Sequence, residues 1–192
     1  MENFILQTIS GCQFNLKKPD ITSISIEDIA HSLSFICRFN GHSKYFFSVA
    51  QHSLLVYMRV KNAGHCQAMQ LGALLHDAQE AYVSDLPTPL KRMLSMYIDI
   101  EKKVQHSIFC QYGIEDVYQN DLNTIKSFDN EITSIERHCL LDKLEPDDCY
   151  SEISSRICEQ PPQKVKEEFI HTSEKLLAAL KGVKNEQPKA TY

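Results

Sequence analysis

The sequence lacks the features that mark disulfide-stabilised and membrane-spanning proteins. Its seven cysteines form no CxxC pair, and their odd number does not suit a disulfide framework or a cysteine-rich zinc site. We therefore expect most of them to be small core residues in a reducing compartment. No stretch approaches the roughly 18 apolar residues of a membrane-spanning helix.

Positive charge is also scarce. The 20 lysines and arginines are outnumbered by 25 acidic residues, which gives a formal net charge of -5. This balance argues against nucleic acid bound on a broad basic surface, although a small phosphorylated ligand needs only a few local cations. The N-terminal segment has neither a basic start nor a long apolar run. We therefore expect no signal peptide and a cytoplasmic location.

The apolar pattern predicts an almost entirely helical protein. With 43% apolar and 23% charged residues, the 192-residue chain suits a single domain over 1–192 that can fold alone. Residues 4–16 alternate loosely around Ser10-Gly11, so a short N-terminal β-hairpin is possible. Beyond it, helical spacing and stop signals predict helices over 26–39, 48–62, 66–83, 95–112, 120–141 and 162–180. The segments expected outside helices are the proline-containing turn 85–89, the acidic loop 145–148 and the polar end 181–192. The fold class is therefore all-α, with six to eight helices.

A His-Asp pair late in the third expected helix is the most informative feature. His76 and Asp77 follow two leucines, and buried imidazoles and carboxylates are costly unless a partner or a metal compensates them. Adjacent residues on a helix diverge by about 100°, so the pair can bind one ion only near a helix end or irregularity. Glu80 lies on the same helical face, where its carboxylate could act as a general base or acid.

Two further potential ligands lie on separate expected helices. His52 lies midway along an apolar helix, where a satisfied core histidine is the simpler interpretation. Asp129 lies on an amphipathic helix, where an exposed aspartate is the simpler interpretation. Together with His76 and Asp77, they would supply two imidazoles and two carboxylates. Such a set suits Mn, Co, Zn, Fe or Ni, and the sequence does not choose among these divalent transition metals.

The set His52, His76, Asp77 and Asp129 resembles the metal motif of the HD-domain phosphohydrolases. Residues 76–91, HDAQEAYVSDLPTPLK, are similar to the segment of the bacterial 5′-deoxynucleotidase branch in which HDxxE precedes a DLPTPxK loop. The likeness runs from about residue 26 to 141 of the printed sequence. It implies a helical HD-domain bundle, a bound divalent metal and a homodimer or higher homo-oligomer.

The resemblance also implies roles for residues outside the metal ligands. Glu80 would be the catalytic carboxylate beside Asp77. Arg38 lies where the 5′-deoxynucleotidase branch places an arginine that binds the substrate phosphate. Asp85 would contact the sugar or a water network. Three more candidates for substrate contact are the pocket-wall residue Thr88 and the possible phosphate contacts Lys91 and His42, for which a solvated surface position is the alternative.

The chain departs from the 5′-deoxynucleotidase branch at one position, on the side of the expected pocket where the sugar would bind. The chain has no tryptophan, and Phe39 occupies the position where the 5′-deoxynucleotidase branch commonly has one. Phenylalanine keeps an apolar wall but lacks the indole donor. Residues 37–42 (CRFNGH) and 45–52 (YFFSVAQH) also resemble phage- and prophage-associated HD proteins, which leaves the substrate open.

The resemblance implies an enzyme, a 5′-nucleotidase that releases nucleoside and phosphate from (deoxy)nucleoside monophosphates. A dNTP triphosphohydrolase, which releases triphosphate, is one alternative. A non-catalytic protein that binds and sequesters a nucleotide is another, although the complete ligand set with Glu80 weighs against it. No nucleic acid polymer or membrane is expected as a partner. Two smaller expectations are a surface or interface ion pair between Glu136 and Arg137, and no functional partners for His31, His65, His106, His138 and His171.

Overall fold

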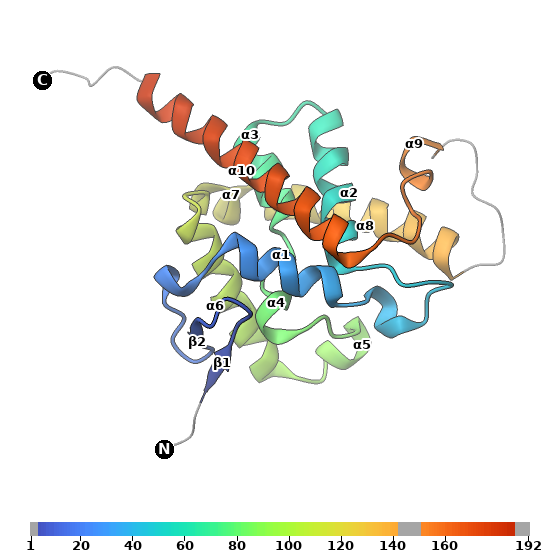
Figure 1. The fold of residues 1–192 in the computed structure, drawn as a ribbon, viewed down its shortest axis with the longest axis horizontal. Helices are drawn as coiled ribbons and strands as arrows, with labels where there is room; N and C mark the ends of the chain where they lie inside the picture. The colour runs from blue at the N-terminus through green and yellow to red at the C-terminus, as the bar shows by residue number, and fades with distance from the viewer. Residues whose placement is uncertain (1–3, 142–150, 187–192) are drawn as a thin grey trace, which may run out of the picture.

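The computed structural model describes residues 4–141 and 151–186, which form helices and one small two-stranded sheet (Figure 1). The strands are β1 (Ile5–Gln7) and β2 (Gln13–Asn15), and the 3-10 helices are η1 (Ile21–Ser23) and η2 (Arg38–Gly41). The α-helices are α1 (Ile26–Phe35), α2 (Val49–Asn62), α3 (Gln67–Leu74), α4 (Glu80–Val83), α5 (Thr88–Lys91), α6 (Ser95–Gln111), α7 (Glu115–Asn120), α8 (Leu122–Leu140), α9 (Ser151–Ser154) and α10 (Pro162–Glu186). The all-α class with an N-terminal hairpin is confirmed, and the acidic loop expected over 145–148 lies outside the described residues.

The hairpin covers the ends of two helices. Its strands are antiparallel, with Leu6 opposite Phe14. Phe14 is fully buried, and its ring stacks on that of Tyr82 in α4 with the centroids 4.0 Å apart. Ser10 in the turn donates from its backbone N–H and its hydroxyl to the carboxylate of Asp28 in α1, at 3.0 and 2.8 Å. The hairpin is therefore held against α1 by hydrogen bonds and against α4 by ring stacking.

The first helix is shorter than the 26–39 expected from the sequence, because it ends at Phe35. The next residue, Ile36, has extended backbone angles. The N–H of Arg38 then donates to the carbonyl oxygen of Phe47 at 2.8 Å, so a contact with a distant segment replaces the helical hydrogen bond. This early end removes Arg38 from α1 and places it in η2.

The long third helix expected from the sequence is interrupted by residues 75–79, which separate α3 from α4. Gln105 of α6 donates its side-chain amide to the carbonyl oxygens of Leu75 and His76, both at 3.0 Å. In a continuous helix these two carbonyl oxygens would accept from backbone N–H groups four residues further on, whereas here they accept from the Gln105 side chain. His76 and Asp77 therefore lie in an irregular turn, which lifts the angular restriction on their binding one ion.

The remaining differences lie in short helices and one terminus. Residues 88–91 form α5 inside the expected turn, and Pro89 is tolerated in its first turn because no N–H donor is needed there. The sequence did not predict α5, α7 or α9, and the third expected helix is divided into α3 and α4, so the described residues contain ten α-helices rather than six to eight. The expectation of a frayed end from residue 181 is wrong for 181–186, which belong to α10.

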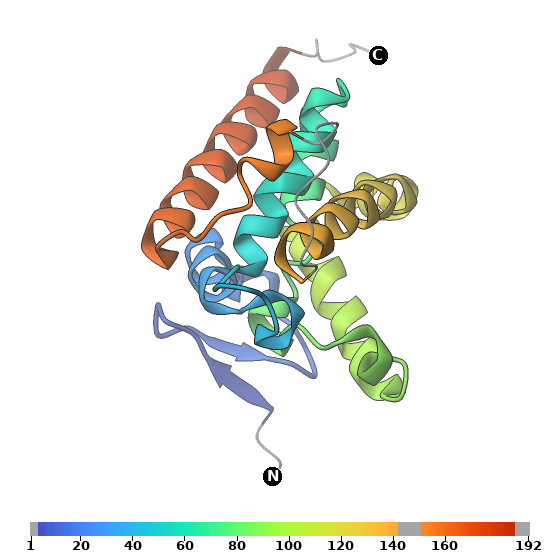
Figure 2. The same ribbon diagram turned by 90° about the vertical axis from the view of Figure 1, so that its right-hand side faces the viewer.

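Helix α2 lies at the centre of the bundle. It packs against α3 and α8, while α10 runs along α1 and α3. In Figure 2, α10 lies on one side of α2 and α8 on the other. The start of α2 is fixed by a capping box between Ser48 and Gln51, and His52 in its first turn is fully buried. In the described part of the chain, no helix is long and apolar enough to cross a membrane.

Candidate metal centre and adjoining cavity

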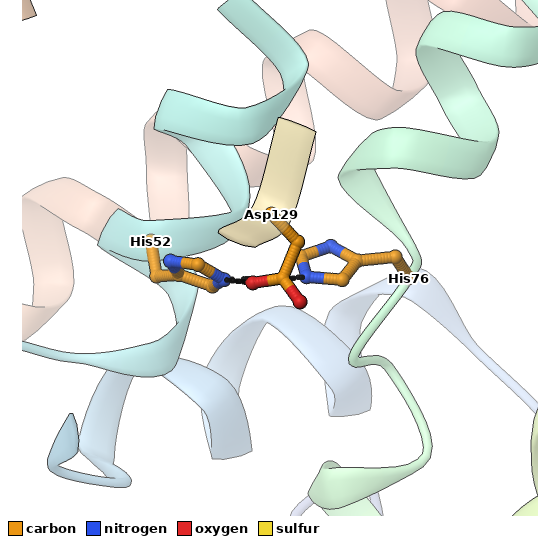
Figure 3. Close-up of side chains that lie close together, drawn as sticks. All are labelled: His52, His76 and Asp129. Carbon is orange, nitrogen blue, oxygen red and sulfur yellow. Dashed lines mark hydrogen bonds and ion pairs between the residues drawn. The ribbon is translucent and has the colours of Figure 1, made fainter. Parts of the chain in front are cut away.

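Three side chains from different parts of the bundle meet at one point (Figure 3). His52 comes from α2, His76 from the turn after α3 and Asp129 from α8. The Nε2 atoms of the histidines are 3.2 Å apart, and Oδ1 of Asp129 lies 3.0 Å from His52 Nε2 and 3.8 Å from His76 Nε2. None of the three side chains is more than 6% exposed. This group could hold a metal ion.

Asp77, the fourth expected ligand, adjoins this group. Its Oδ2 lies 3.2 Å from His76 Nε2 and 3.7 Å from His52 Nε2. Ligands at about 2.1 Å from one ion are separated by about 3.0 Å in an octahedral site and about 3.4 Å in a tetrahedral one. The separations among His52, His76 and Asp129 run from 3.0 to 3.8 Å, close to these values, and Asp77 lies within 3.7 Å of both histidines as a further donor beside them.

The outer nitrogens of the two histidines are held by acceptors. His76 Nδ1 donates to the carbonyl oxygen of Ala73 at 2.8 Å, and His52 Nδ1 donates to Oε1 of Glu136 at 2.8 Å. In the neutral imidazoles both Nε2 lone pairs then point at each other and at the carboxylate of Asp129. Such a concentration of electron-rich atoms is stable only with a cation, or with protons in its place.

The pKa values of these side chains also indicate that the centre needs positive charge. Burial opposes the charged form of His76, but the carboxylates of Asp77 and Asp129 outweigh it and raise the pKa of His76 to about 10. Burial and Arg38 oppose the charged form of His52, but Glu136 and Asp129 outweigh them and raise its pKa. Burial would raise the pKa of Asp129, but its bonds to both histidines hold it well below its ordinary value. Positive charge is therefore favoured at this centre.

Glu136 is a functional candidate that the sequence reasoning placed wrongly. The expected surface ion pair with Arg137 is not what positions it, because Glu136 is fully buried. Its Oε1 accepts from His52, and its Oε2 accepts from Nη2 of Arg38 at 3.0 Å. Glu136 follows Asp129 by seven residues, or two helical turns, so the shared helical face was the signal available in the sequence.

A second chain of bonds runs from Arg38 to the metal centre. Arg38 Nη2 also donates to Oγ1 of Thr133 at 3.0 Å, and that hydroxyl donates to Oδ1 of Asp129 at 3.1 Å. Lys126 forms an ion pair with the other oxygen of Asp129. Lys126 and Thr133 lie one turn before and after Asp129 on α8, and neither is expected at the site from the sequence.

A cavity of about 560 Å³ opens beside these residues. Its wall contains the metal-centre residues Asp77 and Asp129 together with Glu80. All six residues expected to contact substrate also line it, namely Arg38, Phe39, His42, Asp85, Thr88 and Lys91. Four cations face it, from Arg38, Lys91, Lys126 and Arg137. The structure thus brings every site residue expected from the sequence to one cavity or to the donors beside it.

Glu80 has an unusual environment within this wall. It is only 3% exposed, and its Oε2 has no hydrogen-bond partner among the described residues. Lys91 Nζ lies 3.9 Å from Oε1, but pairs more closely with Glu101 at 2.6 Å. Burial, followed by the negative charges of Asp77 and Asp85, raises the pKa of Glu80 well above its ordinary value. Glu80 is thus poised to carry a proton at the cavity wall.

The backbone at one end of the cavity adopts a rarely populated conformation. Phe39 and Asn40 both have φ of 53°, in the left-handed region that non-glycine residues seldom adopt. The guanidinium carbon of Arg38 lies 5.3 Å from the centroid of the Phe39 ring. The Nε of Arg38 is buried and has no hydrogen-bond partner among the described residues. This turn presents an arginine and an aromatic ring side by side at the cavity.

Comparison with known proteins finds relatives but no family. No family model matches the chain. The uncharacterized protein YfdR of Escherichia coli (strain K12) is 45% identical over 112 residues, which cover 58% of this chain and 60% of YfdR. The uncharacterized protein RCAP_rcc00048 of Rhodobacter capsulatus is 38% identical over 112 residues, which cover 55% of this chain and 57% of that protein. The similarity thus spans less than two thirds of each relative, and neither name states an activity.

Proposed function

We propose that this chain is a divalent-metal-dependent phosphohydrolase of the HD type that hydrolyses (deoxy)nucleoside monophosphates to nucleoside and phosphate. One observation carries the proposal. The donors Asp77 and Asp129 line the same cavity as Glu80 and Arg38, a proton carrier and a phosphate-binding cation. The resemblance of residues 76–91 to the nucleotidase segment of HD phosphohydrolases supports the same reaction.

The metal centre and Arg38 would share the phosphate. A cation held by His52, His76, Asp77 and Asp129 would supply Lewis-acid polarisation of the phosphoryl group and a lowered pKa for an attacking water. Arg38 offers its guanidinium to the phosphate oxygens, and its free Nε is one of the donors available. Glu136 accepts from Nη2 of this guanidinium, which fixes its orientation.

Glu80 is assigned to proton transfer. In the hydrolysis of a phosphomonoester, water adds to phosphorus and the bond from phosphorus to the sugar oxygen breaks. Burial and the neighbouring carboxylates raise the pKa of Glu80, which favours its role as the donor of a proton to the leaving sugar oxygen. The unpartnered Oε2 of Glu80 supports this role, since a buried polar atom without a partner calls for a ligand or a catalytic function.

The dimensions of the cavity support a small nucleotide as substrate. Its volume of about 560 Å³ lies within the range of about 300–1,000 Å³ that is typical of small-molecule pockets. Phe39 provides an apolar surface for a sugar or base, and the Pro87-Thr88-Pro89 segment forms part of the wall. The net charge of the chain is negative, so anion binding depends on these local cations.

Product analysis tests the proposal and separates it from its alternatives. Metal-stripped protein is reconstituted with Mn, Co, Zn, Mg, Fe or Ni and incubated with deoxynucleoside monophosphates, ribonucleoside monophosphates and deoxynucleoside triphosphates. We expect metal-dependent phosphate release from monophosphates and its loss in Asp77→Ala. Triphosphate as the product would assign the chain as a triphosphohydrolase. Unchanged nucleotide with every metal, despite tight binding of metal and nucleotide, would assign a sequestering protein and overturn the proposal.

A further inference from the structure

A second cluster of metal-ligating side chains lies at the junction of α6 and α7. It consists of His106 and Cys110 from α6 and Glu115 from α7, and none of the three lines the cavity described above. No functional partner is expected for His106 from the sequence, because Glu115 lies across the turn between two helices. We propose that these three residues bind one divalent transition cation of the zinc class, independently of the proposed phosphohydrolase site.

Local geometry brings the three donors together. His106 and Cys110 are four residues apart on α6, so they lie on the same helical face. The chain then reverses at Gly113, whose φ of 66° is a left-handed conformation that suits glycine. This reversal brings Glu115, the first residue of α7, back beside the end of α6. One donor atom from each of the three residues lies within 4.8 Å of the others.

The two distances from His106 Nε2 to the other two donor atoms are close to the ligand-to-ligand distances around a tetrahedral ion. With bonds of about 2.0–2.1 Å to nitrogen and oxygen and about 2.3 Å to sulfur, tetrahedral angles give nitrogen-to-oxygen and nitrogen-to-sulfur edges of about 3.3 and about 3.6 Å. His106 Nε2 lies 3.3 Å from Oε1 of Glu115 and 3.7 Å from Sγ of Cys110. The same sulfur lies 3.9 Å from His106 Nδ1, so the imidazole, which is 45% exposed, has to turn to direct Nε2 at the ion. A direct charge-assisted hydrogen bond from imidazolium to carboxylate would be shorter, at about 2.7–2.9 Å.

The surroundings orient the donors and leave access to a cation. The His106 ring meets that of Tyr118 edge-on, with the centroids 5.1 Å apart. Gln119 donates its side-chain amide to Oε1 of Glu115 at 3.3 Å. His106 and Glu115 are 45% and 49% exposed, while Cys110 is half-buried. A set of one nitrogen, one sulfur and one oxygen prefers zinc or cobalt to magnesium or calcium, and a fourth position remains for water.

Cobalt is the probe that separates this cluster from the first metal centre. Cobalt bound to a thiolate gives a sulfur-to-metal charge-transfer band in the near ultraviolet, and the four donors of the first centre include no sulfur. We expect the band when full-length, metal-stripped protein with reduced cysteines is titrated with Co²⁺, saturating by about two ions per chain because the first centre also binds Co²⁺. It should persist in Asp77→Ala, so failure of the first centre would not remove it.

Matched variants decide the outcome. Cys110→Ser should abolish the band, and His106→Gln and Glu115→Gln should each weaken Co²⁺ binding at least tenfold. Cys66→Ser is the control, because Cys66 is an exposed thiol at the N-cap of α3, where serine is a favourable residue. A missing band in the native protein would overturn the proposal. A band that survives Cys110→Ser, or one lost only in Cys110→Ser and unchanged in both other variants, would also overturn it.

Discussion

The Glu136 carboxylate lies 2.8 Å from Nδ1 of His52, and neither side chain is exposed to solvent. The other oxygen of the same carboxylate accepts from Arg38. One buried acid therefore orients a metal-centre histidine and the cation assigned to the substrate phosphate. Because these contacts share a side chain, we expect changes at Glu136 to affect both metal binding and substrate binding.

Glu136→Gln should weaken metal binding. The glutamine amide has one acceptor oxygen, whereas the carboxylate accepts from both His52 and Arg38, so one donor would face an NH₂ group. We expect metal affinity to fall roughly 10- to 100-fold, as is typical when the partner of a metal-ligating histidine is lost. A calorimetric titration of metal-stripped protein measures this. The control is Glu131→Gln on the same helix, a half-exposed partner of Arg59, and equal affinities in the two variants would contradict the assigned role.

Glu80→Gln should remove activity while leaving metal binding intact. Glutamine has nearly the shape of a protonated glutamic acid, so the buried position tolerates it, but it cannot transfer the proton. We expect kcat to fall by about 10²- to 10⁴-fold, with metal affinity changed only slightly. Steady-state kinetics with a deoxynucleoside monophosphate check this, with Glu27→Gln on the surface of α1 as the control. Full activity in Glu80→Gln would rule out Glu80 as the proton donor.

Arg38→Lys should impair the use of substrate. Lysine retains the positive charge but loses the planar fork that can bind phosphate and Glu136 together. The loss of a charge-assisted hydrogen bond, about 1.5–3 kcal/mol, corresponds to a fall in kcat/KM of about 10- to 100-fold. Arg59→Lys, outside the cavity, should leave kcat/KM unchanged. If Arg38→Lys lowered metal affinity without changing kcat/KM at saturating metal, Arg38 would only support Glu136.

The stability of the metal-stripped protein should fall as pH rises. The pKa of His76 is raised to about 10 in the folded state and is about 6.5 in an unfolded chain. A raised folded pKa contributes stability that is complete below about pH 6.5 and is lost as pH rises toward about 10. Thermal unfolding at a series of pH values should therefore show a declining Tm, and His76→Gln should reduce the slope. Added metal should stabilise the protein more at the alkaline end, because metal binding requires neutral imidazoles; a slope unchanged in His76→Gln would contradict this assignment.

Close packing of α3 against α7 and α8 gives a test of the fold itself. A Cβ atom on Gly72 would lie 2.7 Å from a methyl group of Val117 and 3.1 Å from one of Ile125. We therefore expect Gly72→Ala to lower the free energy of unfolding by about 1–3 kcal/mol. Gly182→Ala on α10 meets nothing within 4 Å and should raise it by up to about 1 kcal/mol. Chemical denaturation measures both, and a Gly72→Ala protein as stable as the native one would contradict this packing.

Local signals in the sequence predict much of the helical framework. The helix expected to begin at residue 48 corresponds to α2, whose N-cap is Ser48, and the Ser10-Gly11 pair marks the turn of the hairpin. The helix ends at Phe35 and Leu74 could not be predicted in this way. They depend on the hydrogen bond that the Phe47 carbonyl oxygen accepts from Arg38 and on those that the Gln105 side chain donates, and apolar periodicity does not report such contacts.

In the candidate site, too, some residues could be predicted from the sequence and others depend on contacts between distant segments. The resemblance identified His52, His76, Asp77 and Asp129 as a set; His52, His76 and Asp129 form a group that could hold a metal ion, and Asp77 lies beside the two histidines. Glu136 was placed at the surface, since helical spacing gives its face but not its burial. Partners such as this one become visible only when the fold places α8 against α2.

Phosphate release by metal-stripped protein, measured before and after reconstitution in native protein and Asp129→Asn, is the most direct test of the metal centre. We expect native protein to be inactive when stripped and to recover with added Mn²⁺ or Co²⁺ on a deoxynucleoside monophosphate. Asp129→Asn should remain inactive, whereas Asp99→Asn, an exposed change on α6, should recover fully. Phosphate release by Asp129→Asn at the native rate, or by native protein without any metal, would contradict a catalytic metal held by His52, His76, Asp77 and Asp129.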